Sequence, residues 1–205
     1  MTGEFVKAVG GKVAHVTASS NLPSIHAHGL LPANTLAAQE GIDHTELALR
    51  DHRMQVGAAR LNHQKPILHG LKAAHRILDG HTPASWAHHL DTRVFLWPER
   101  KGRAFAASIQ RDLDITILWL DTAKLATALR DHIDLSPINS GNFTQGGAHA
   151  RRGDWLYVPL SAGLDTFRQN RCKRGLKTTP DTVTEISLRC PIAPDLLADL
   201  LIRHD

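Results

Sequence analysis

Short runs of apolar and β-branched residues recur along the chain and predict strands. The clearest run covers residues 114–120, with the sequence Asp-Ile-Thr-Ile-Leu-Trp-Leu. Runs of similar character cover residues 12–17, 94–97, 155–158 and 183–188. Strands are therefore expected from the first twenty residues to the last quarter of the chain.

Apolar residues between these runs have the spacing of helices. Residues 21–28 follow two serines, carry Pro23 in their first turn and stop at Gly29, which is a typical helix start and stop. Helices are also expected at residues 35–63, 98–109, 121–129 and 194–202. Residues 1–11 have no clear pattern and are expected to form an irregular lead-in.

The order of these elements sets the fold class. Strands and helices mix without a regular alternation of strand, helix and parallel strand, which favours an α+β fold over a doubly wound sheet. The 205 residues are expected to form a single domain, residues 1–205.

Two segments do not fit this pattern of predicted strands and helices. Residues 134–153 are rich in turn residues, and a loop of this length inside a compact domain is usually functional. Residues 165–177 hold the densest basic run, and substrate binding is the expected role of Arg171 and Arg174 within it.

Composition narrows the choice of partner. The net charge of +4, with 14 histidines counted as neutral, is mildly basic and compatible with an anionic partner such as a nucleic acid. No apolar run approaches the ~20 residues that span a bilayer, so no membrane association is expected. The N-terminus has no apolar signal core, and a cytoplasmic location is expected. Cys172 and Cys190 are expected to be two unrelated reduced thiols.

Motifs of several common enzyme classes do not occur in the sequence. The histidines lack an H-E-x-x-H or C-x-x-C setting, so no metal site is expected. There is no G-x-S-x-G, no G-x-G-x-x-G and no Walker loop, which argues against a serine hydrolase, a Rossmann site and a P-loop.

Three predicted strands each carry a residue suited to binding or catalysis. The first carries His15-Val16-Thr17, the second Arg93-Val94-Phe95-Leu96-Trp97, and the last Thr184-Glu185-Ile186. In this order they resemble the ADP-ribosyltransferase superfamily, in its branch with a histidine, aromatic, glutamate triad. The resemblance implies a split β-sheet core with flanking helices and an NAD-dependent glycosyltransferase activity.

The opening of the chain is also similar to DarT-type ADP-ribosyltransferases, which modify DNA bases. The matching residues are His15-Val16-Thr17, Asn21-Leu22-Pro23-Ser24-Ile25 and Gly29-Leu30. Related bacterial domains of undefined function share the strand at residues 93–97 and a Pro-Ile-Asn-Ser-Gly loop, here residues 137–141. The resemblance extends from residue 13 to about residue 190, nearly the whole chain.

The resemblance implies a role for individual residues. Glu185 and Arg53 are the expected catalytic residues, with Arg50 as the alternative to Arg53 by spacing. The residues expected to bind NAD are His15, Thr17, Asn21, Leu30, Arg53, Phe95 and Trp97. Asn139 and Gly141, in the loop before Glu185, are expected to bind substrate.

The chemistry agrees with these residue types. A carboxylate stabilises the positive charge that develops on the ribose when the nicotinamide leaves. An aromatic face stacks on the nicotinamide, and an arginine holds a diphosphate through two hydrogen bonds. Trp97 and Pro98 stand where poly-ADP-ribosyltransferases have small residues, so mono-ADP-ribosylation is expected rather than polymer synthesis.

The acceptor is open between a DNA or RNA base, a protein and a small molecule. A toxin or defence effector with a neutralising antitoxin partner is one role that fits the resemblance. The alternatives are a catalytically inactive domain of the same fold that binds NAD or nucleic acid, and a small RNA-cleaving or RNA-binding protein that uses His15 and the basic run.

Overall fold

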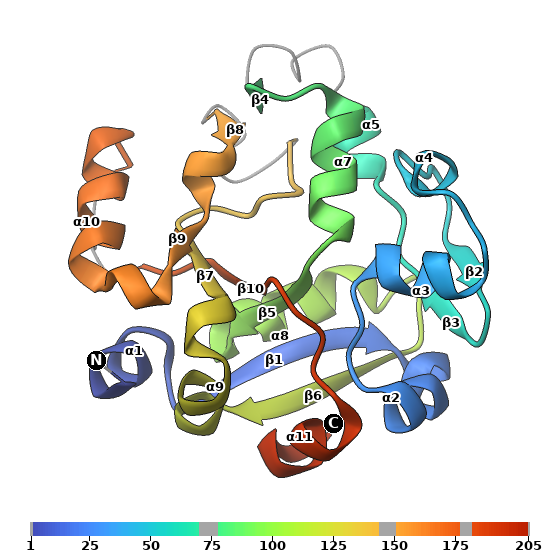
Figure 1. Cartoon of the computed structure of the whole chain (residues 1–205), viewed down its shortest axis with the longest axis horizontal. Coiled ribbons are helices and arrows are strands. Elements are labelled where there is room, and N and C mark those ends of the chain that lie inside the picture. Colours follow the sequence, from blue (N-terminus) through green and yellow to red (C-terminus); the bar gives the residue numbers. More distant parts are fainter. Residues whose placement is uncertain (1, 70–77, 144–150, 177–181, 205) are drawn as a thin grey trace.

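The computed structural model describes residues 2–69, 78–143, 151–176 and 182–204. Within these ranges a seven-stranded sheet runs through the molecule in the order β11-β6-β1-β5-β10-β7-β9, with every neighbouring pair antiparallel (Figure 1). Helices flank this sheet, so the fold is α+β, as the sequence predicts.

The strands of the main sheet are β1 (Lys12–Ala18), β5 (Val94–Pro98), β6 (Ile115–Asp121), β7 (Ile133–Ser136), β9 (Val158–Pro159), β10 (Glu185–Leu188) and β11 (Leu201–His204). Two small sheets pair β2 (Met54–Val56) with β3 (Ala59–Leu61) and β4 (Leu78–Asp79) with β8 (Arg152–Gly153). The helices are α1 (Thr2–Val9), α2 (Leu22–His28), α3 (Ala33–Gln39), α4 (His44–Leu47), α5 (Lys65–His69), α7 (Pro83–Asp91), α8 (Glu99–Ile109), α9 (Thr122–Leu129), α10 (Leu164–Lys173) and α11 (Pro194–Leu200). Short 3-10 turns cover Ser19–Asn21, Arg130–His132, Asp154–Leu156 and Leu160–Ala162.

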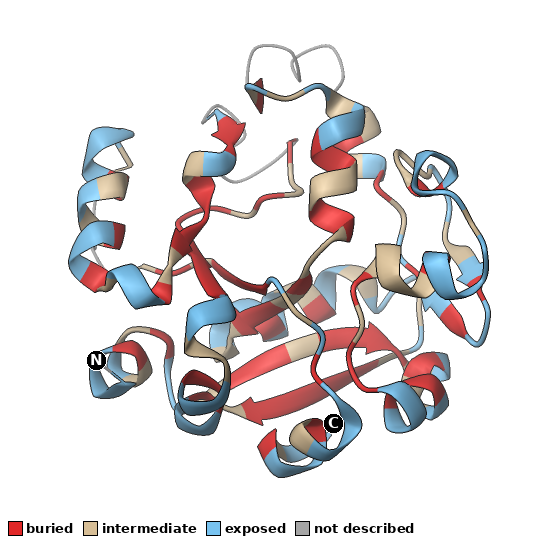
Figure 2. Ribbon diagram, in the orientation of Figure 1, coloured by how far each residue is buried: buried red, intermediate tan, exposed pale blue. Residues whose placement is uncertain are grey.

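The two faces of the sheet are covered differently. Helices α1, α2, α9, α10 and α11 contribute to one large apolar cluster with Val13, Leu96 and Ile186 of the central strands. Helix α8 packs on the other face, against Ala14 and Trp119. The central strands β1, β5, β6, β7 and β10 are accordingly mostly buried, whereas the edge strand β11 is largely exposed and the helices keep exposed outer sides (Figure 2).

Most expected elements lie where the pattern places them. The expected strands at residues 12–17 and 94–97 are β1 and β5, and the clearest run, at 114–120, is β6. The expected helices that start at residues 21, 98, 121 and 194 are α2, α8, α9 and α11, but α11 ends at Leu200 and residues 201–202 belong to β11, which pairs with β6. The expected strand at residues 155–158 is reduced to the short β9, because a 3-10 turn occupies Asp154–Leu156.

The expected helix over residues 35–63 is wrong. Only α3 and α4 form there, and the rest is a hairpin of β2 and β3 whose pairs include Val56 with Ala59. Gly57 opens the two-residue turn with a φ of +53°, a backbone conformation that favours glycine. The hairpin buries Val56 and Leu61 in a small cluster with α3 and α4, which replaces the expected helical packing.

The N-terminal segment also differs from the expectation. Residues 2–9 form α1 instead of an irregular lead-in, because Phe5 and Val9 lie four residues apart and both bury their side chains in the main cluster. In the expected loop at 134–153, the first residues belong to β7 and the last to β8, and residues 144–150 lie outside the described residues. None of the described helices is long and apolar enough to cross a membrane.

Gly29, at the end of α2, gives the first prediction. Its φ of +78° and ψ of −164° lie in a region that only glycine adopts readily, and an added Cβ would meet the Ile192 carbonyl oxygen at 1.9 Å. Gly163 has a similar backbone, with φ +85° and ψ 160°, but open space around it. Gly29→Ala should therefore lower the free energy of unfolding by more than the about 1–3 kcal/mol of backbone strain that both variants share.

Urea denaturation of the two variants beside the wild type measures this difference. Equal losses for Gly29→Ala and Gly163→Ala would show that the close approach of Gly29 to Ile192 is not important for stability.

Candidate functional site

The main sheet opens between β1 and β5. These two strands pair only through Val13 with Pro98 and Ala14 with Trp97. Beyond that point β1 continues along β6 as far as Ala18, while β5 continues along β10. The two halves of the sheet therefore share a short junction and then separate.

A histidine side chain bridges the start of this opening. His15 Nδ1 lies 3.0 Å from the Phe95 carbonyl oxygen, which can only accept, so Nδ1 carries the proton. Burial lowers the pKa of His15, and the bond to Phe95 acts in the opposite direction. The imidazole is therefore neutral at neutral pH, with Nε2 left as a hydrogen-bond acceptor.

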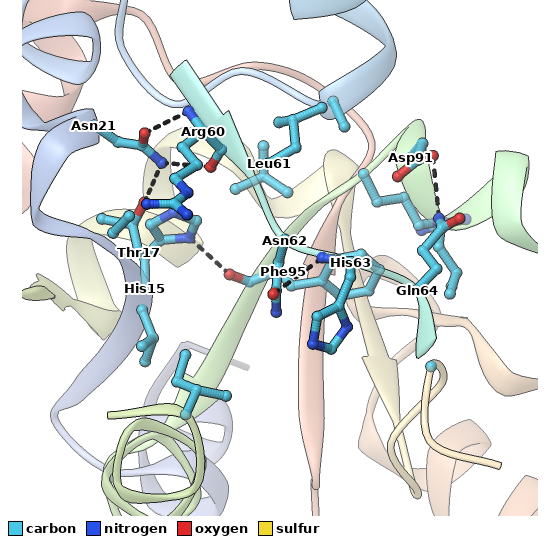
Figure 3. A pocket seen from close by; sticks show the side chains of 18 of the residues that line it. His15, Thr17, Asn21, Arg60, Leu61, Asn62, His63, Gln64, Asp91 and Phe95 are labelled. Carbon is cyan, nitrogen blue, oxygen red and sulfur yellow. Dashed lines mark hydrogen bonds between the residues drawn. The ribbon is translucent and has the colours of Figure 1, made fainter. Parts of the chain in front are cut away.

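A cavity of about 470 Å³ lies at the opening, within the size range of small-molecule sites (Figure 3). All of the residues expected to bind or act on NAD line it, together with the two expected from the loop: His15, Thr17, Asn21, Leu30, Arg53, Phe95, Trp97, Asn139, Gly141 and Glu185. They come from segments up to 170 positions apart, since the cavity includes both His15 and Glu185.

Glu185 is the buried acid of the cavity. It is the first residue of β10 and is 2% exposed. Ser140 Oγ donates to its carboxylate at 2.6 Å, and the Ser140 amide lies 3.3 Å from the same oxygen. Burial raises the pKa of Glu185 to about 7, although the Ser140 bonds and the charges of Arg152 and Arg93 oppose the rise.

Ser140 owes its position to a tightly held loop. The fully buried Trp86 donates from Nε1 to the Ser140 carbonyl at 3.1 Å, and buried Arg152 donates to the carbonyls of Asn139 and Asn142. The Asn139 side chain accepts from the Gly141 amide at 3.0 Å. Asn139 and Gly141 thus line the cavity, but the residue between them makes the contact with Glu185, and the Pro-Ile-Asn-Ser-Gly motif itself contains it.

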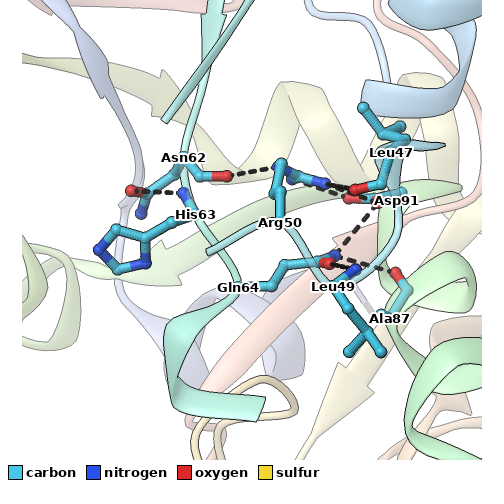
Figure 4. A network of polar contacts seen from close by, with 8 residues as sticks. All are labelled: Leu47, Leu49, Arg50, Asn62, His63, Gln64, Ala87 and Asp91. Carbon is cyan, nitrogen blue, oxygen red and sulfur yellow. Dashed lines mark hydrogen bonds and ion pairs between the residues drawn. The ribbon is translucent and has the colours of Figure 1, made fainter. Parts of the chain in front are cut away.

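Arg50 and Arg53 both line the cavity, but they differ in what they bind. Arg50 forms a bidentate ion pair with Asp91 at 2.8 and 3.0 Å and donates to the carbonyls of Leu47 and Asn62 (Figure 4). Arg53 donates to the Asp112 carbonyl at 3.3 Å, and its buried Nε has no hydrogen-bond partner in the part of the chain that the structure describes. Arg53 is therefore the better placed of the two to hold an anion.

The network around Arg50 also explains how the hairpin is attached to the core. Gln64 donates to Asp91 and to the Ala87 carbonyl at 3.1 Å each, and accepts from the Leu49 amide at 2.6 Å (Figure 4). Burial raises the pKa of Asp91, and its bonds to Arg50 act against that rise. A buried pair of this kind fixes geometry more reliably than it adds stability.

Asn21 and Thr17 lie in the cavity wall, where the polar atoms of Asn21 are all used. Its amide oxygen accepts from the Arg60 backbone at 2.6 Å, and its nitrogen donates to the Arg60 carbonyl and to Thr17 Oγ1 at 3.0 Å each (Figure 3). Leu30 is buried and bridges to Ile192 across the backbone. Trp97 stacks on Phe105 with ring centroids 4.4 Å apart, and within the described ranges its buried Nε1 has no hydrogen-bond partner.

Arg171 and Arg174, expected to bind substrate, do not line the cavity. Arg171 is buried and donates to the carbonyls of Pro137 and Thr182. Arg174 lies over the Trp155 ring at 4.4 Å and pairs with Asp79 at 3.5 Å. The density of positive charge in the sequence could not reveal that these two guanidinium groups have partners within the protein.

The cavity also contains cationic and imidazole side chains that the sequence did not single out. Arg60 and His63 line it from β3 and the residues that follow. Burial and the charges of Arg53 and Lys65 lower the pKa of His63. Among the described residues, no group of three or more histidine, cysteine or acidic side chains is arranged to hold a metal ion.

A family model described as "Family of unknown function (DUF7002)" matches residues 11–200. The chain belongs to the DUF7002 family. A search among curated proteins finds no match. The match covers the whole main sheet apart from β11, together with the cavity, so the function of this DUF7002 domain must be argued from the chemistry of the site.

Burial of Glu185 should make the free energy of unfolding depend on pH. Between about pH 4.5 and about pH 7 the unfolded chain releases the Glu185 proton while the folded protein keeps it, so folding stability falls as the pH rises. Glu185→Gln removes this titration. Relative to the wild type, the variant should gain up to about 3 kcal/mol over that range and nothing below it.

Urea denaturation of both proteins across this pH range measures the gain. Glu46→Gln, at an exposed position in α4, is the control. Its free energy of unfolding should change with pH in the same way as that of the wild type. A constant difference between Glu185→Gln and the wild type at every pH would contradict a buried, protonated Glu185.

Proposed function

We propose that this DUF7002 domain is an NAD-dependent mono-ADP-ribosyltransferase. One observation carries the proposal: His15, Phe95 and Glu185, on three strands that are neighbours in the sheet, all line one cavity. These are the three residues that the resemblance to the histidine, aromatic, glutamate branch marks, and their sequence separation gives no reason for them to meet unless the fold brings them together.

Glu185 is suited to breaking the bond between nicotinamide and ribose. As nicotinamide leaves, positive charge develops on the ribose, and a buried carboxylate stabilises that charge strongly because water does not screen it. With a pKa of about 7, Glu185 is about half ionised at neutral pH. The cationic nicotinamide ring of bound NAD would favour the ionised form further.

The other cavity residues would hold NAD in a reactive position. His15 Nε2 can accept a hydrogen bond from a ribose hydroxyl, because Nδ1 is committed to Phe95. The Phe95 ring offers a face for the nicotinamide. Arg53, whose Nε is unpaired among the described residues, is suited to the diphosphate.

A nucleic-acid base is the acceptor that the charges favour. The chain is basic, and Arg53 and Arg60 lie in the cavity wall with Lys65 close to His63.

Cytoplasmic action, where NAD is supplied, is part of the same proposal. So is a role as a toxin or defence effector that a partner protein neutralises.

Release of nicotinamide from NAD tests this function. Wild-type protein should release nicotinamide in the presence of single-stranded DNA or RNA, and Glu185→Gln should lose at least about 100-fold in rate. The variant should still bind NAD, and saturation at about 100 times the dissociation constant should stabilise both proteins by about 2.7 kcal/mol. Calorimetric melting with and without NAD gives the second value.

Each contrary result points to a different alternative. Binding of NAD without nicotinamide release under any condition would indicate a catalytically inactive domain. Equal release by wild type and Glu185→Gln would remove Glu185 from the chemistry. Cleavage of RNA without NAD, together with no thermal shift from NAD, would reject the proposal in favour of a nuclease.

A further inference from the structure

The β2–β3 hairpin has an apolar side and a polar side. Side chains alternate along a strand, and the pairing of Gln55 with Arg60 places these two on the same side. Met54, Val56 and Leu61 belong to the cluster that faces α3 and α4. The polar side therefore carries Arg60, and Arg53 and Asn62 continue it beyond the ends of the strands.

The backbone of Arg60 is held by a side chain from another segment that lines the cavity. Asn21, between β1 and α2, takes the place of a neighbouring strand: its amide bonds both the N–H and the carbonyl of Arg60, at 2.6 and 3.0 Å. The same Asn21 nitrogen donates to Thr17 Oγ1 on β1. One buried side chain thus fixes the distance between β3 and β1 at this point.

The hydrogen bonds from Asn21 to the Arg60 backbone set the direction of the Arg60 side chain. It extends from β3 toward Thr17 and His15 at the cavity (Figure 3). The backbone of Arg60 is pinned while its side chain remains exposed, and no ion pair or hydrogen bond of its guanidinium is found among the described residues. Arg50, ten residues earlier in the chain, is in contrast neutralised by Asp91.

We propose that Arg60 binds a phosphate group of a nucleotide substrate in the cavity, and that Asn21 is the residue that positions it. The fork of a guanidinium matches two phosphate oxygens, and a pinned backbone reduces the entropy lost on binding. The phosphate belongs to a dinucleotide such as NAD or to the backbone of a nucleic-acid acceptor. This inference extends the proposed function, but phosphate binding itself needs no catalysis.

The test compares Arg60→Gln with Arg100→Gln. Arg100 is exposed on α8 and does not line the cavity, so its loss removes the same charge elsewhere. The probes are ADP, NAD and a random-sequence single-stranded DNA, each titrated by calorimetry. Arg60→Gln should weaken binding of at least one probe by about 10- to 100-fold, as expected for a hydrogen-bonded charge pair. Arg100→Gln should leave the affinity for the cavity ligands unchanged.

The pattern of losses identifies the source of the phosphate. Weaker ADP and NAD binding with unchanged DNA binding assigns Arg60 to the diphosphate. Weaker DNA binding with unchanged ADP and NAD binding assigns Arg60 to the acceptor backbone. In that case the slope of log affinity against log salt concentration for DNA should decrease in magnitude by about 0.7. Asn21→Ala should reproduce the loss seen in Arg60→Gln, and combining the two changes should add little, because Asn21 acts through Arg60.

Two results separate this inference from the proposed function. If wild type binds ADP in an Arg60-dependent way but never releases nicotinamide, the phosphate site stands and the transferase proposal fails. If Arg60→Gln binds all three probes as Arg100→Gln does, the assignment of Arg60 is overturned whatever the activity of the wild type.

Discussion

The short pairing between β1 and β5 is the constraint on which the site depends. A complete ladder would continue past Ala14 and Trp97 and close the sheet, leaving no room for a ligand between the strands. Instead, the His15 side chain supplies one bond to the Phe95 carbonyl where the backbone ladder stops. The opening is thus supported by a residue that is also available to a ligand, because only one of its ring nitrogens is used.

The same opening allows a carboxyl group to remain buried. Glu185 begins β10, where the loop after β7 passes over it, and Ser140 from that loop supplies two hydrogen bonds. Trp86 and Arg152 both hold the loop by hydrogen bonds to its carbonyls, so the cost of keeping Glu185 away from water is offset by fixed partners. A group that lowers stability at neutral pH is typical of a functional site.

Much of the main sheet could be predicted from the sequence, because buried strands such as β6 are read from apolar runs and helices such as α2 have clear start and stop residues. The hairpin could not be predicted, since Gly57 followed by Ala58 and Ala59 is a weak turn signal and the packing partners α3 and α4 precede the hairpin in the chain. For the same reason Arg60 was missed.

Sequence reasoning identified the strand residues that line the cavity more fully than its charged residues. His15, Phe95 and Glu185 sit on strands whose order sequence reasoning identified, and all three line the cavity. Charge density alone does not place Arg171 and Arg174 at the cavity, because partners within the fold, distant in sequence, bind both guanidinium groups. Asn21 lines the cavity as expected, but the sequence could not reveal that its side-chain amide is bound to the backbone of Arg60.

The central claim is that NAD lies in the opening between β1 and β5. Isotope-filtered NOE spectroscopy of NAD bound to Glu185→Gln, which prevents turnover, tests it most directly. The nicotinamide protons should show contacts with the Phe95 ring, and the adjoining ribose protons should show contacts with His15. NAD that contacts neither strand, or that gives no bound signals at saturating concentration, would contradict the account.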